Sequence, residues 1–389
     1  MSEGADLRLM LMITKELPYE LWFPENSWTG LNVEPPITMT RALLPFSWLY
    51  ASLMICRNKG FDWGLIRSER MGVPVISIGN ITMGGTGKTP LVEYVVRRCL
   101  AKGKRVAIVS RGYKRASKGV VVVSDGRTVL VDARQGGDEP VQMARKFPQA
   151  MVVVGERRVR AAKVAAQGLG AEVVVLDDGF QHRHLQRDLD VVVLDSTRDV
   201  TVEPIFPVGR RREPLSGLQR AGIVALSKVG LNSHPVDWTA KLNHWYSGPV
   251  IRYQYKTDMV FQASNHASLP IEHLRMKPAL VFSGIGHHKG FIDQLESMGV
   301  PVKADVRFSD HYMYTSGDGQ VLIKKMDQSN SEVCITTEKD MMRLMANPEL
   351  VETFLNVHRV YYTRISVDIV DEEDRFLSMI DACVEKKTA

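Results

Sequence analysis

The residues most suited to chemistry in this sequence form a glycine-rich segment that ends in lysine and threonine. The segment reads Gly84-Gly85-Thr86-Gly87-Lys88-Thr89, and it follows an apolar run at residues 73–78. An apolar-periodic segment follows it, so the order predicts a strand, a loop and a helix. Such a loop turns backbone N–H groups toward an anion, while the lysine adds a charge and the threonine hydroxyl can ligate Mg²⁺. The expected ligand is a nucleoside triphosphate, and the alternative is a glycine-rich turn with a solvated lysine.

One position departs from the usual phosphate-binding loop. The standard pattern places a glycine five residues before the final Gly-Lys pair, and Thr82 stands there. The segment is therefore a shortened glycine loop that keeps Gly-Lys-Thr intact.

Two acidic residues follow another apolar run. Asp177 and Asp178 come directly after residues 173–176, which are Val-Val-Val-Leu. A strand that ends in acids is how a Walker B motif delivers a carboxylate to Mg²⁺ at the carboxyl edge of a parallel sheet. One acid can hold the metal while the other orients water or substrate. The alternative is an ordinary turn or helix N-cap.

A second acidic pair, Asp138-Glu139, follows two glycines and precedes Pro140. A carboxylate in such a rigid loop could serve as the base for a hydroxyl nucleophile. The same residues equally suit the first turn of a helix, where acids and proline are favoured.

Guanidinium groups suited to bidentate phosphate recognition occur at Arg158 and within the run 210–214, which includes Arg212. The alternative for each is solvated surface. The segment Ser110-Arg111-Gly112-Tyr113, after a further apolar run, offers a cation, an aromatic ring and a flexible glycine.

Short β-branched runs alternate with longer mixed segments through the first half of the chain, which favours a doubly wound α/β fold with a mostly parallel sheet. The runs lie at residues 105–109, 151–154, 172–176, 190–194 and 222–226. A hairpin over 120–131, turning at Asp125-Gly126, is expected at the sheet edge or over the site.

A polar stretch near 229–243 precedes a fresh series of apolar runs, which predicts a second, smaller α/β domain. The expected boundaries are an extension of uncertain order at 1–38, a nucleotide-binding domain at 39–229, the smaller domain at 230–369, and a C-terminal helix within 370–389 that packs back on the first domain. In the smaller domain, titratable residues concentrate around His311 and in 336–340.

Zinc is not expected, because the pairs His182/His184 and His287/His288 lack the spacing that places two ligands on one helix face. ATP is favoured over GTP, because no residue separates Lys339 from Asp340 as the guanine-reading motif requires.

Composition describes an ordinary soluble-type chain of 389 residues, with 44% hydrophobic residues, 24% charged residues and a formal net charge of +6. The basic balance favours anionic partners such as nucleotide, nucleic acid or an anionic membrane surface. No helix-turn-helix, zinc-finger or aromatic-basic RNA motif supports nucleic acid. Four widely spaced cysteines indicate neither a disulfide framework nor a zinc site, and so favour a reducing compartment. The first 38 residues show no secretory signal.

The segment 42–56 is mostly apolar, lies between Arg41 and Arg57, and carries aromatic residues beside Pro45. It falls short of the ~20 residues that a membrane span needs. A helix lying in the membrane interface fits this pattern, and a helix packed on the protein core is the alternative.

Taken together, these motifs resemble the tetraacyldisaccharide 4'-kinase family of lipid A biosynthesis. The resemblance runs from about Thr40 to the last helix, and the Thr82 departure is also similar to the family pattern. Its motifs are Leu44-Pro45, Val75-Ile76-Ser77-Ile78-Gly79-Asn80 with the glycine loop, Ser110-Arg111-Gly112-Tyr113, Gly137-Asp138-Glu139-Pro140, Asp177-Asp178-Gly179-Phe180-Gln181-His182, Arg212-Glu213-Pro214, Phe308-x-Asp310-His311 and Thr336-Thr337-Glu338-Lys339-Asp340.

The resemblance implies transfer of the ATP γ-phosphate to the 4'-hydroxyl of an anionic, acylated disaccharide 1-phosphate, which gives lipid IVA. It implies that Asp138 pairs with His311 to activate this hydroxyl. The remaining implied roles are Lys88 and Thr89 at the phosphates and Mg²⁺, with Glu139, Asp177, Asp178 and Gln181 around the metal and Arg158 and Arg212 near the phosphates.

The acylated substrate implies a peripheral enzyme on the cytoplasmic face of the inner membrane, held through the 42–56 helix, with no obligatory protein partner evident. The alternative function is that of a membrane-associated partitioning ATPase. Such proteins carry a lysine before the two glycines, where this sequence has Met83.

Overall fold

The computed structural model describes residues 37–230, 237–257, 259–286, 288–309, 312–357 and 359–386. The chain divides into two compact units. The first unit runs to Gln254 and resumes at Val367, and the second comprises Tyr255–Ser366. The second unit is therefore an insertion in the chain of the first, entered within one strand, β8, and left within another, β15.

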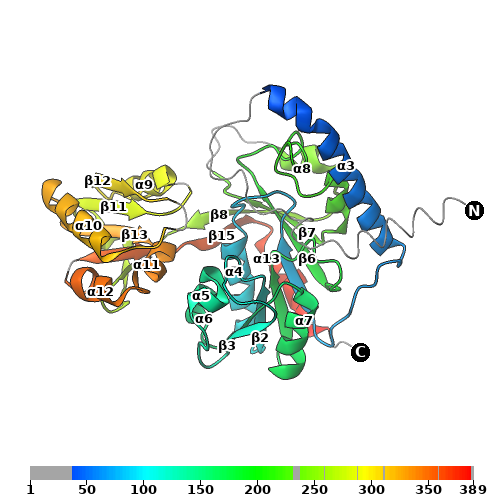
Figure 1. Ribbon diagram of the computed structural model, residues 1–389, viewed down its shortest axis with the longest axis horizontal. Helices are drawn as coiled ribbons and strands as arrows, with labels where there is room; N and C mark the ends of the chain where they lie inside the picture. The colour runs from blue at the N-terminus through cyan, green and yellow to red at the C-terminus, as the bar shows by residue number, and fades with distance from the viewer. Residues whose placement is uncertain are drawn as a thin grey trace, which may run out of the picture. The chain divides into compact units, whose positions relative to one another are not determined.

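A mostly parallel sheet forms the centre of the first unit (Figure 1). Its nine strands, counted over the described residues, lie in the order β15-β8-β7-β6-β1-β5-β2-β4-β3. The strands are β1 Val75–Gly79, β2 Val106–Ser110, β3 Val121–Asp125, β4 Met151–Val154, β5 Val173–Asp177, β6 Leu189–Asp195, β7 Ile223–Ser227, β8 Val250–Lys256 and β15 Ser366–Asp371.

The central strands are buried on both faces, which explains why their sequences are continuous β-branched runs instead of alternating patterns. Every residue of β1, β2, β4 and β7 is buried. These strands confirm the predicted doubly wound sheet. The predicted hairpin begins with β3, which pairs antiparallel with β4 at the sheet edge. Its second arm is reduced to a single bridge between Ser124 and Val129.

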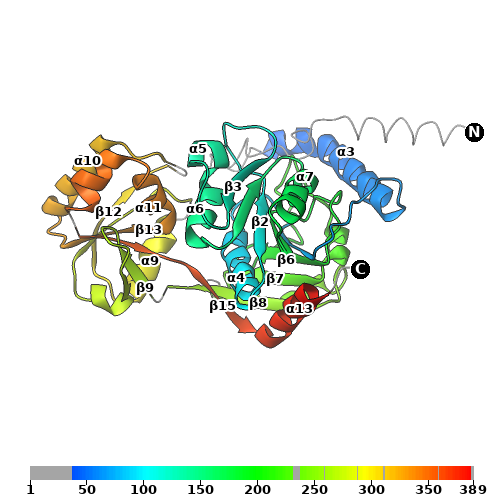
Figure 2. The same ribbon diagram turned by 90° about the horizontal axis from the view of Figure 1, so that it is seen from below.

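Helices of the first unit pack on this sheet and on one another. They are α3 Ile37–Asp62, α4 Lys88–Ala101, α5 Ala133–Gly136, α6 Asp138–Lys146, α7 Arg158–Lys163, α8 Trp238–Leu242 and α13 Glu373–Glu385. The C-terminal helix α13 packs against α4, where Nη2 of Arg98 lies 2.5 Å from Oδ2 of Asp381 and the rings of Tyr94 and Phe376 stack at 6.0 Å (Figure 2).

The second unit has its own six-stranded sheet, in the order β10-β9-β14-β13-β11-β12 over the described residues. Its elements are β9 Met259–Gln262, β10 Ser268–Pro270, β11 Ala279–Ser283, β12 Val302–Arg307, β13 Val333–Thr337, β14 Val360–Thr363, α9 His288–Ser297, α10 Ser316–Gln328, α11 Glu338–Leu344 and α12 Pro348–Leu350. Strand β13 lies between β11 and β14, parallel to both.

The division between the units falls later in the chain than the predicted boundary at 229/230. The polar stretch after β7 leads into α8, whose buried Trp238 and Leu242 join a core cluster of the first unit. Strand β8 then pairs in parallel with β7, so most of it also belongs to the first sheet.

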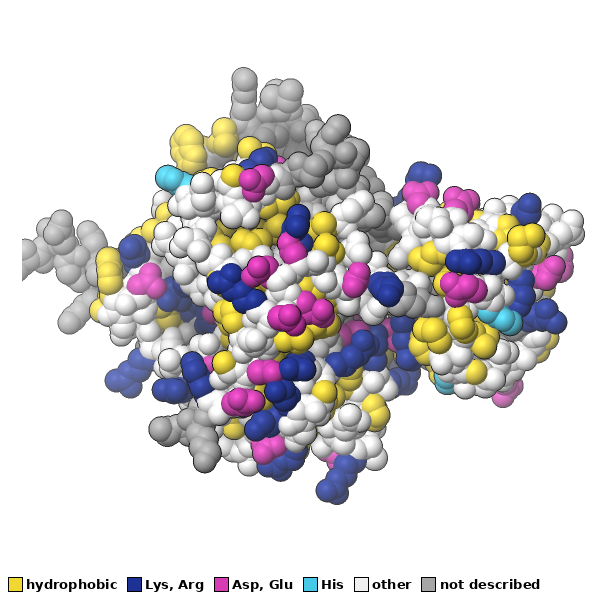
Figure 3. Space-filling model, turned by 180° about the vertical axis from the view of Figure 1, so that it is seen from behind, with side chains coloured by type: hydrophobic (Ala, Val, Ile, Leu, Met, Phe, Trp, Pro, Cys, Tyr) yellow, Lys and Arg dark blue, Asp and Glu magenta, His cyan; other side chains and the backbone are white. Residues whose placement is uncertain are grey.

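Basic and acidic side chains lie interspersed over the described residues of the face drawn in Figure 3. This mixing accompanies the modest net charge of +6.

Candidate active site

The chemically suited residues are brought together because parallel strands end at one edge of the sheet. Strand β1 lies between β5 and β6, and Ile78 is paired with Asp177 across the β1–β5 ladder. The glycine loop that follows β1 and the two acids that close β5 are therefore neighbours. Strand β2 ends at Ser110 and β4 ends just before the segment that carries Arg158.

The glycine loop connects β1 to the first turn of α4, as the sequence predicts. Gly84 and Gly87 have φ values of 101° and 87°, a region that favours glycine, and Gly87 caps α4 so that Lys88 and Thr89 open the helix. The carbonyl oxygens of Thr86 and Gly87 accept hydrogen bonds from Ser227 Oγ (2.7 Å) and Tyr253 OH (2.9 Å). Loop carbonyls are thus held by the protein, and the amide groups at the helix start suit an anion.

The nonstandard Thr82 lies where the loop pairs with a second segment. Thr82 forms an antiparallel bridge with Arg211, and the backbone N–H of Met83 donates to the carbonyl of Arg210 at 2.7 Å. The N–H of Arg212 donates to the carbonyl of Ile81, also at 2.7 Å. The shortened loop is therefore braced by residues 210–212.

Two cations meet one carboxylate at the centre of the site. Nζ of Lys88 lies 3.4 Å from Oδ1 of Asp178, and Nη1 of Arg212 lies 2.8 Å from Oδ2. Burial opposes ionisation of Asp178, but Arg212 and Lys88 outweigh it and hold the pKa of this carboxyl well below its usual range. Asp178 also has φ 56°, a strained conformation of the kind that clusters at functional sites.

The neighbouring Asp177 has the opposite character. Burial, followed by repulsion from Glu139, raises its pKa to about 7, and Lys88 opposes the rise. Glu139 lies in the first turn of α6. A carboxylate whose ionisation is disfavoured by a neighbouring acid, at the same sheet edge as the helix start that carries Thr89, is suited to a divalent cation with oxygen ligands. Within the described part of the chain, no three His, Cys, Asp or Glu residues form a metal-binding group by themselves. Mg²⁺ commonly uses one or two carboxylates together with substrate phosphates, so the pattern fits this ion.

Asp138 is the first residue of α6, and its side chain is exposed. The loop before it approaches the Ser110–Tyr113 segment closely. A Cβ on Gly137, whose φ is 91°, would lie 3.2 Å from Cα of Gly112. The glycines thus allow two backbone segments to touch and fix the start of α6. The proposed partner His311 lies outside the described residues.

Arg158 opens α7 and is buried, with Nη1 donating to the carbonyl of Gly155 at 2.9 Å. It is among the cations that favour ionisation of Asp177 and Asp178. Gln181 is also buried, and its Nε2 donates to the carbonyl of Asn80 at 2.6 Å. Arg158 therefore lies near the acids, and the Gln181 amide contacts the start of the glycine loop.

Sequence reasoning missed a lysine on the other side of the loop. Nζ of Lys228, directly after β7, donates to the carbonyl of Gly85 at 3.1 Å and lies 2.5 Å from Oδ2 of Asp195. Asp195 closes β6. Asp177 is identified in the sequence because it is a charged residue at the end of an apolar run. Asp195 and Lys228 also end or follow such runs, so the same signal could have found them.

The apolar N-terminal segment forms α3, which is longer than the predicted 42–56 helix. One side is packed, with Ser47, Met54 and Arg57 buried. The other exposes Phe46 and Trp48, at 61% and 68%. The helix thus has a packed side, as expected of a helix on the protein core, and an exposed apolar side, as expected of a helix in the membrane interface. A search of the described residues finds no helix with the length and apolar character to cross a membrane.

Comparison with known proteins identifies the family of this chain. A family model described as tetraacyldisaccharide-1-P 4'-kinase (LpxK) matches residues 39–385. The chain belongs to the tetraacyldisaccharide 4'-kinase family. A family member from Chlorobaculum parvum is 39% identical over 352 residues, covering 88% of this chain and 95% of its own. One from Chlorobaculum tepidum is 38% identical over 324 residues, covering 82% and 91%.

A solved family structure is also similar. The crystal structure of LpxK from Aquifex aeolicus, in complex with ATP, matches with a TM-score of 0.73 and 31% identity. The match covers 89% of this chain and 99% of that chain. The fold of this kinase therefore has a counterpart in a crystal structure in complex with ATP.

Proposed function

We propose that this chain transfers the γ-phosphoryl group of ATP to the 4'-hydroxyl of a tetraacyldisaccharide 1-phosphate, giving lipid IVA. The observation that carries the proposal is the convergence of Lys88 and Arg212 on Asp178, beside a glycine loop, in a chain of the 4'-kinase family. Family membership also disfavours the alternative of a partitioning ATPase.

Phosphoryl transfer asks the protein mainly to position the phosphates and to stabilise their charge. The loop formed by Gly84, Gly85, Thr86 and Gly87 would hold the phosphates, and three cations would act with it. Those cations are Lys88, Arg158 and Arg212. Lys88 and Arg212, which both contact Asp178, would supply positive charge to the phosphates when ATP is bound, where negative charge develops in the transition state.

Mg²⁺ bound at this site neutralises phosphate charge and orients the reacting group. The residues that would hold it, directly or through water, are Thr89, Glu139, Asp177, Asp178 and Gln181. Asp177 and Glu139 fit this role, because repulsion from Glu139 disfavours ionisation of Asp177 and a cation between them would offset it.

We propose that Asp138 and His311 remove the proton from the 4'-hydroxyl. A histidine supported by a carboxylate has a pKa near working pH, which suits a general base. The exposed position of Asp138 at the start of α6 leaves its carboxylate accessible to substrate.

We also propose that the enzyme is peripheral on the cytoplasmic face of the inner membrane, through the exposed side of α3. Phe46→Ser together with Trp48→Ser reduces cosedimentation with vesicles of anionic phospholipid, because both side chains are exposed. Val202→Ser is a matched control, since Val202 is 75% exposed outside α3. Unchanged sedimentation of the α3 variant would contradict this localisation.

The test of the reaction is incubation of the protein with γ-labelled ATP and the tetraacylated disaccharide 1-phosphate in detergent micelles. We expect label on the lipid and little ATP hydrolysis without it. ATP hydrolysis that proceeds without lipid, together with no phosphate transfer to the lipid, would overturn the kinase function and favour the partitioning ATPase.

A further inference from the structure

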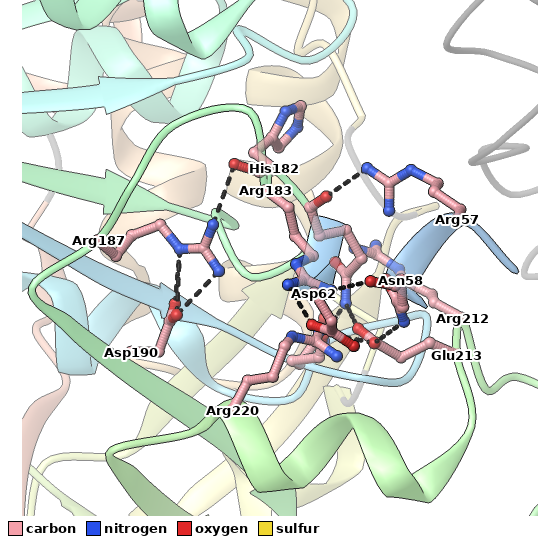
Figure 4. A network of polar contacts seen from close by, with 12 residues as sticks. Arg57, Asn58, Asp62, His182, Arg183, Arg187, Asp190, Arg212, Glu213 and Arg220 are labelled. Atoms are coloured by element: carbon pink, nitrogen blue, oxygen red, sulfur yellow. Dashed lines mark hydrogen bonds and ion pairs between the residues drawn. The ribbon is translucent and has the colours of Figure 1, made fainter. Parts of the chain in front are cut away.

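The carboxylate of Glu213 is fully buried in the first unit, and neither phosphate nor metal binding explains it. Its Oε1 accepts a hydrogen bond of 2.8 Å from Nε2 of Gln181. Its Oε2 accepts bonds from Nη2 of Arg220 at 2.8 Å and Nδ2 of Asn58 at 3.3 Å. Figure 4 shows Asn58, Glu213 and Arg220 converging from separate segments. A buried charge is costly unless it is paired in this way.

One of these partners links the carboxylate to the nucleotide loop. Nε2 of Gln181, which contacts Glu213, also donates to the carbonyl of Asn80 at 2.6 Å. The side chain of Asn80 in turn donates to Oγ1 of Thr86 at 2.9 Å. The NH₂ group of Gln181 thus donates to both Glu213 and the carbonyl of Asn80. Glu213 therefore fixes the orientation of this amide and, through it, the position of the Asn80 carbonyl at the start of the loop.

Helix α3 holds the same segments from the other side. Nη2 of Arg57 donates to the carbonyl of Gln181, and Tyr50 OH donates to the carbonyl of Arg212, each at 2.8 Å. Asn58, which contacts Glu213, also lies on α3. The residues 181 and 212–213 are therefore held between α3 and the glycine loop.

We propose that Glu213 is a positioning residue for phosphoryl transfer, whose buried carboxylate orients the Gln181 amide and so fixes the glycine loop relative to α3. This role rests on the proposed kinase function. The hydrogen bonds found for the Glu213 carboxylate among the described residues go to Gln181, Arg220 and Asn58, so its effect on ATP is expected to pass through Gln181 to the loop backbone.

The variant Glu213→Gln keeps one oxygen of the carboxylate and replaces the other by an NH₂ group. Its one remaining oxygen faces the Arg220 guanidinium, because a buried charge without an acceptor costs more than an unpaired amide. The new NH₂ group then faces Nε2 of Gln181, so two donors oppose each other. We expect the KM for ATP to rise about tenfold, the effect of losing one buried hydrogen bond, while the KM for lipid stays within about twofold.

A second substitution distinguishes positioning from simple stability. In Glu213→Gln/Arg220→Met, no guanidinium competes for the oxygen, which returns to Gln181. Among the described residues Oδ1 of Asn58 has no hydrogen-bond partner, so this amide can flip and accept from the new NH₂. We expect the KM for ATP to return to within about threefold of the unsubstituted value. Glu213→Leu/Arg220→Met lacks the oxygen and keeps the raised KM.

Asp190→Asn is the matched control for loss of a buried ion pair. Nη2 of Arg187 lies 2.9 Å from Oδ2 of Asp190, and the two side chains are 7% and 10% exposed (Figure 4). No hydrogen bond of this pair to the glycine loop is found among the described residues. We expect a lowered Tm with an unchanged KM for ATP.

The proposal is overturned if Glu213→Gln leaves the KM for ATP unchanged, or if the double Gln/Met variant is no better than the Leu/Met variant. The Gln/Met and Leu/Met pair decides the matter even if Glu213→Gln does not fold, because neither retains an unpaired guanidinium. Titration calorimetry of ATP binding without lipid separates the two proposals. If the variants show the expected order of ATP affinities but the unsubstituted protein transfers no phosphate to lipid, the kinase function is refuted and the positioning role of Glu213 stands.

Discussion

Binding of Mg²⁺ and ATP should release a proton from Asp177. Burial and Glu139 raise the pKa of this carboxyl to about 7, and a metal-binding carboxylate must be ionised. At pH 7 about half of the molecules carry this proton before binding, so about 0.5 proton is released per site. The release should increase to about 0.9 at pH 6 and decrease to about 0.1 at pH 8. Asp178, whose pKa is lowered, contributes none of it.

Titration calorimetry in buffers of different ionisation enthalpy measures the release as the slope of observed heat against buffer enthalpy. ATP releases protons of its own, so the measured quantity is the difference between the unsubstituted protein and Asp177→Asn. Equal slopes for the two proteins at pH 6 and pH 7 would refute the argument, because they would show that Asp177 is ionised before the metal arrives.

Three other substitutions test separate parts of the structure. In Gly79→Ala the new Cβ would lie 2.5 Å from Cβ and 2.7 Å from the backbone N of Phe180, so the two strand ends must separate. We expect a loss of about 1–3 kcal/mol in the free energy of unfolding and at least about tenfold lower kcat/KM for ATP; normal values would show that the strand ends move freely. Asp138→Asn should lower kcat by about 10²-fold or more with little change in ATP affinity, and normal turnover would exclude Asp138 as part of the base. Asp340→Leu removes a buried carboxylate that lies 3.1 Å from Nη1 of Arg343 and also accepts hydrogen bonds from the Gly284 N–H and the Tyr314 OH. Chemical denaturation should therefore show a loss of about 3–5 kcal/mol in the second unit, whereas a loss below about 1 kcal/mol would show that the Gly284 carbonyl, which also accepts from Arg343, satisfies the guanidinium.

The parts of the site that sequence predicts are those fixed locally. A run of β-branched residues buried on both faces defines β1 or β5, and the residue after the run must then lie at the sheet edge. This rule places Asp177 at the same sheet edge as the glycine loop, whereas their adjacency follows from the pairing of β1 with β5. Nothing about His311 is tested in this way, because it lies outside the described residues.

The parts that sequence could not predict depend on contacts between distant segments. Tyr50 meets the carbonyl of Arg212, 162 positions along the chain, and Ser227 meets that of Thr86, 141 positions away. No local pattern encodes such pairs. The predicted domain boundary lies too early for a related reason. It rests on the polar composition near 229–243, whereas the assignment of α8 and β8 to the first unit depends on the buried Trp238 and Leu242 and on the pairing of β8 with β7.

The insertion of the second unit has a consequence for how the protein is made. The edge strand β15 and helix α13 of the first unit leave the ribosome only after all of residues 255–366, and the Arg98–Asp381 contact joins residues 283 positions apart. A growing chain can therefore complete the inserted unit while the first sheet still lacks its last strand. Folding of the inserted unit then replaces a long open loop by a compact connection between β8 and β15, so that β15 and α13 can join a sheet synthesised much earlier.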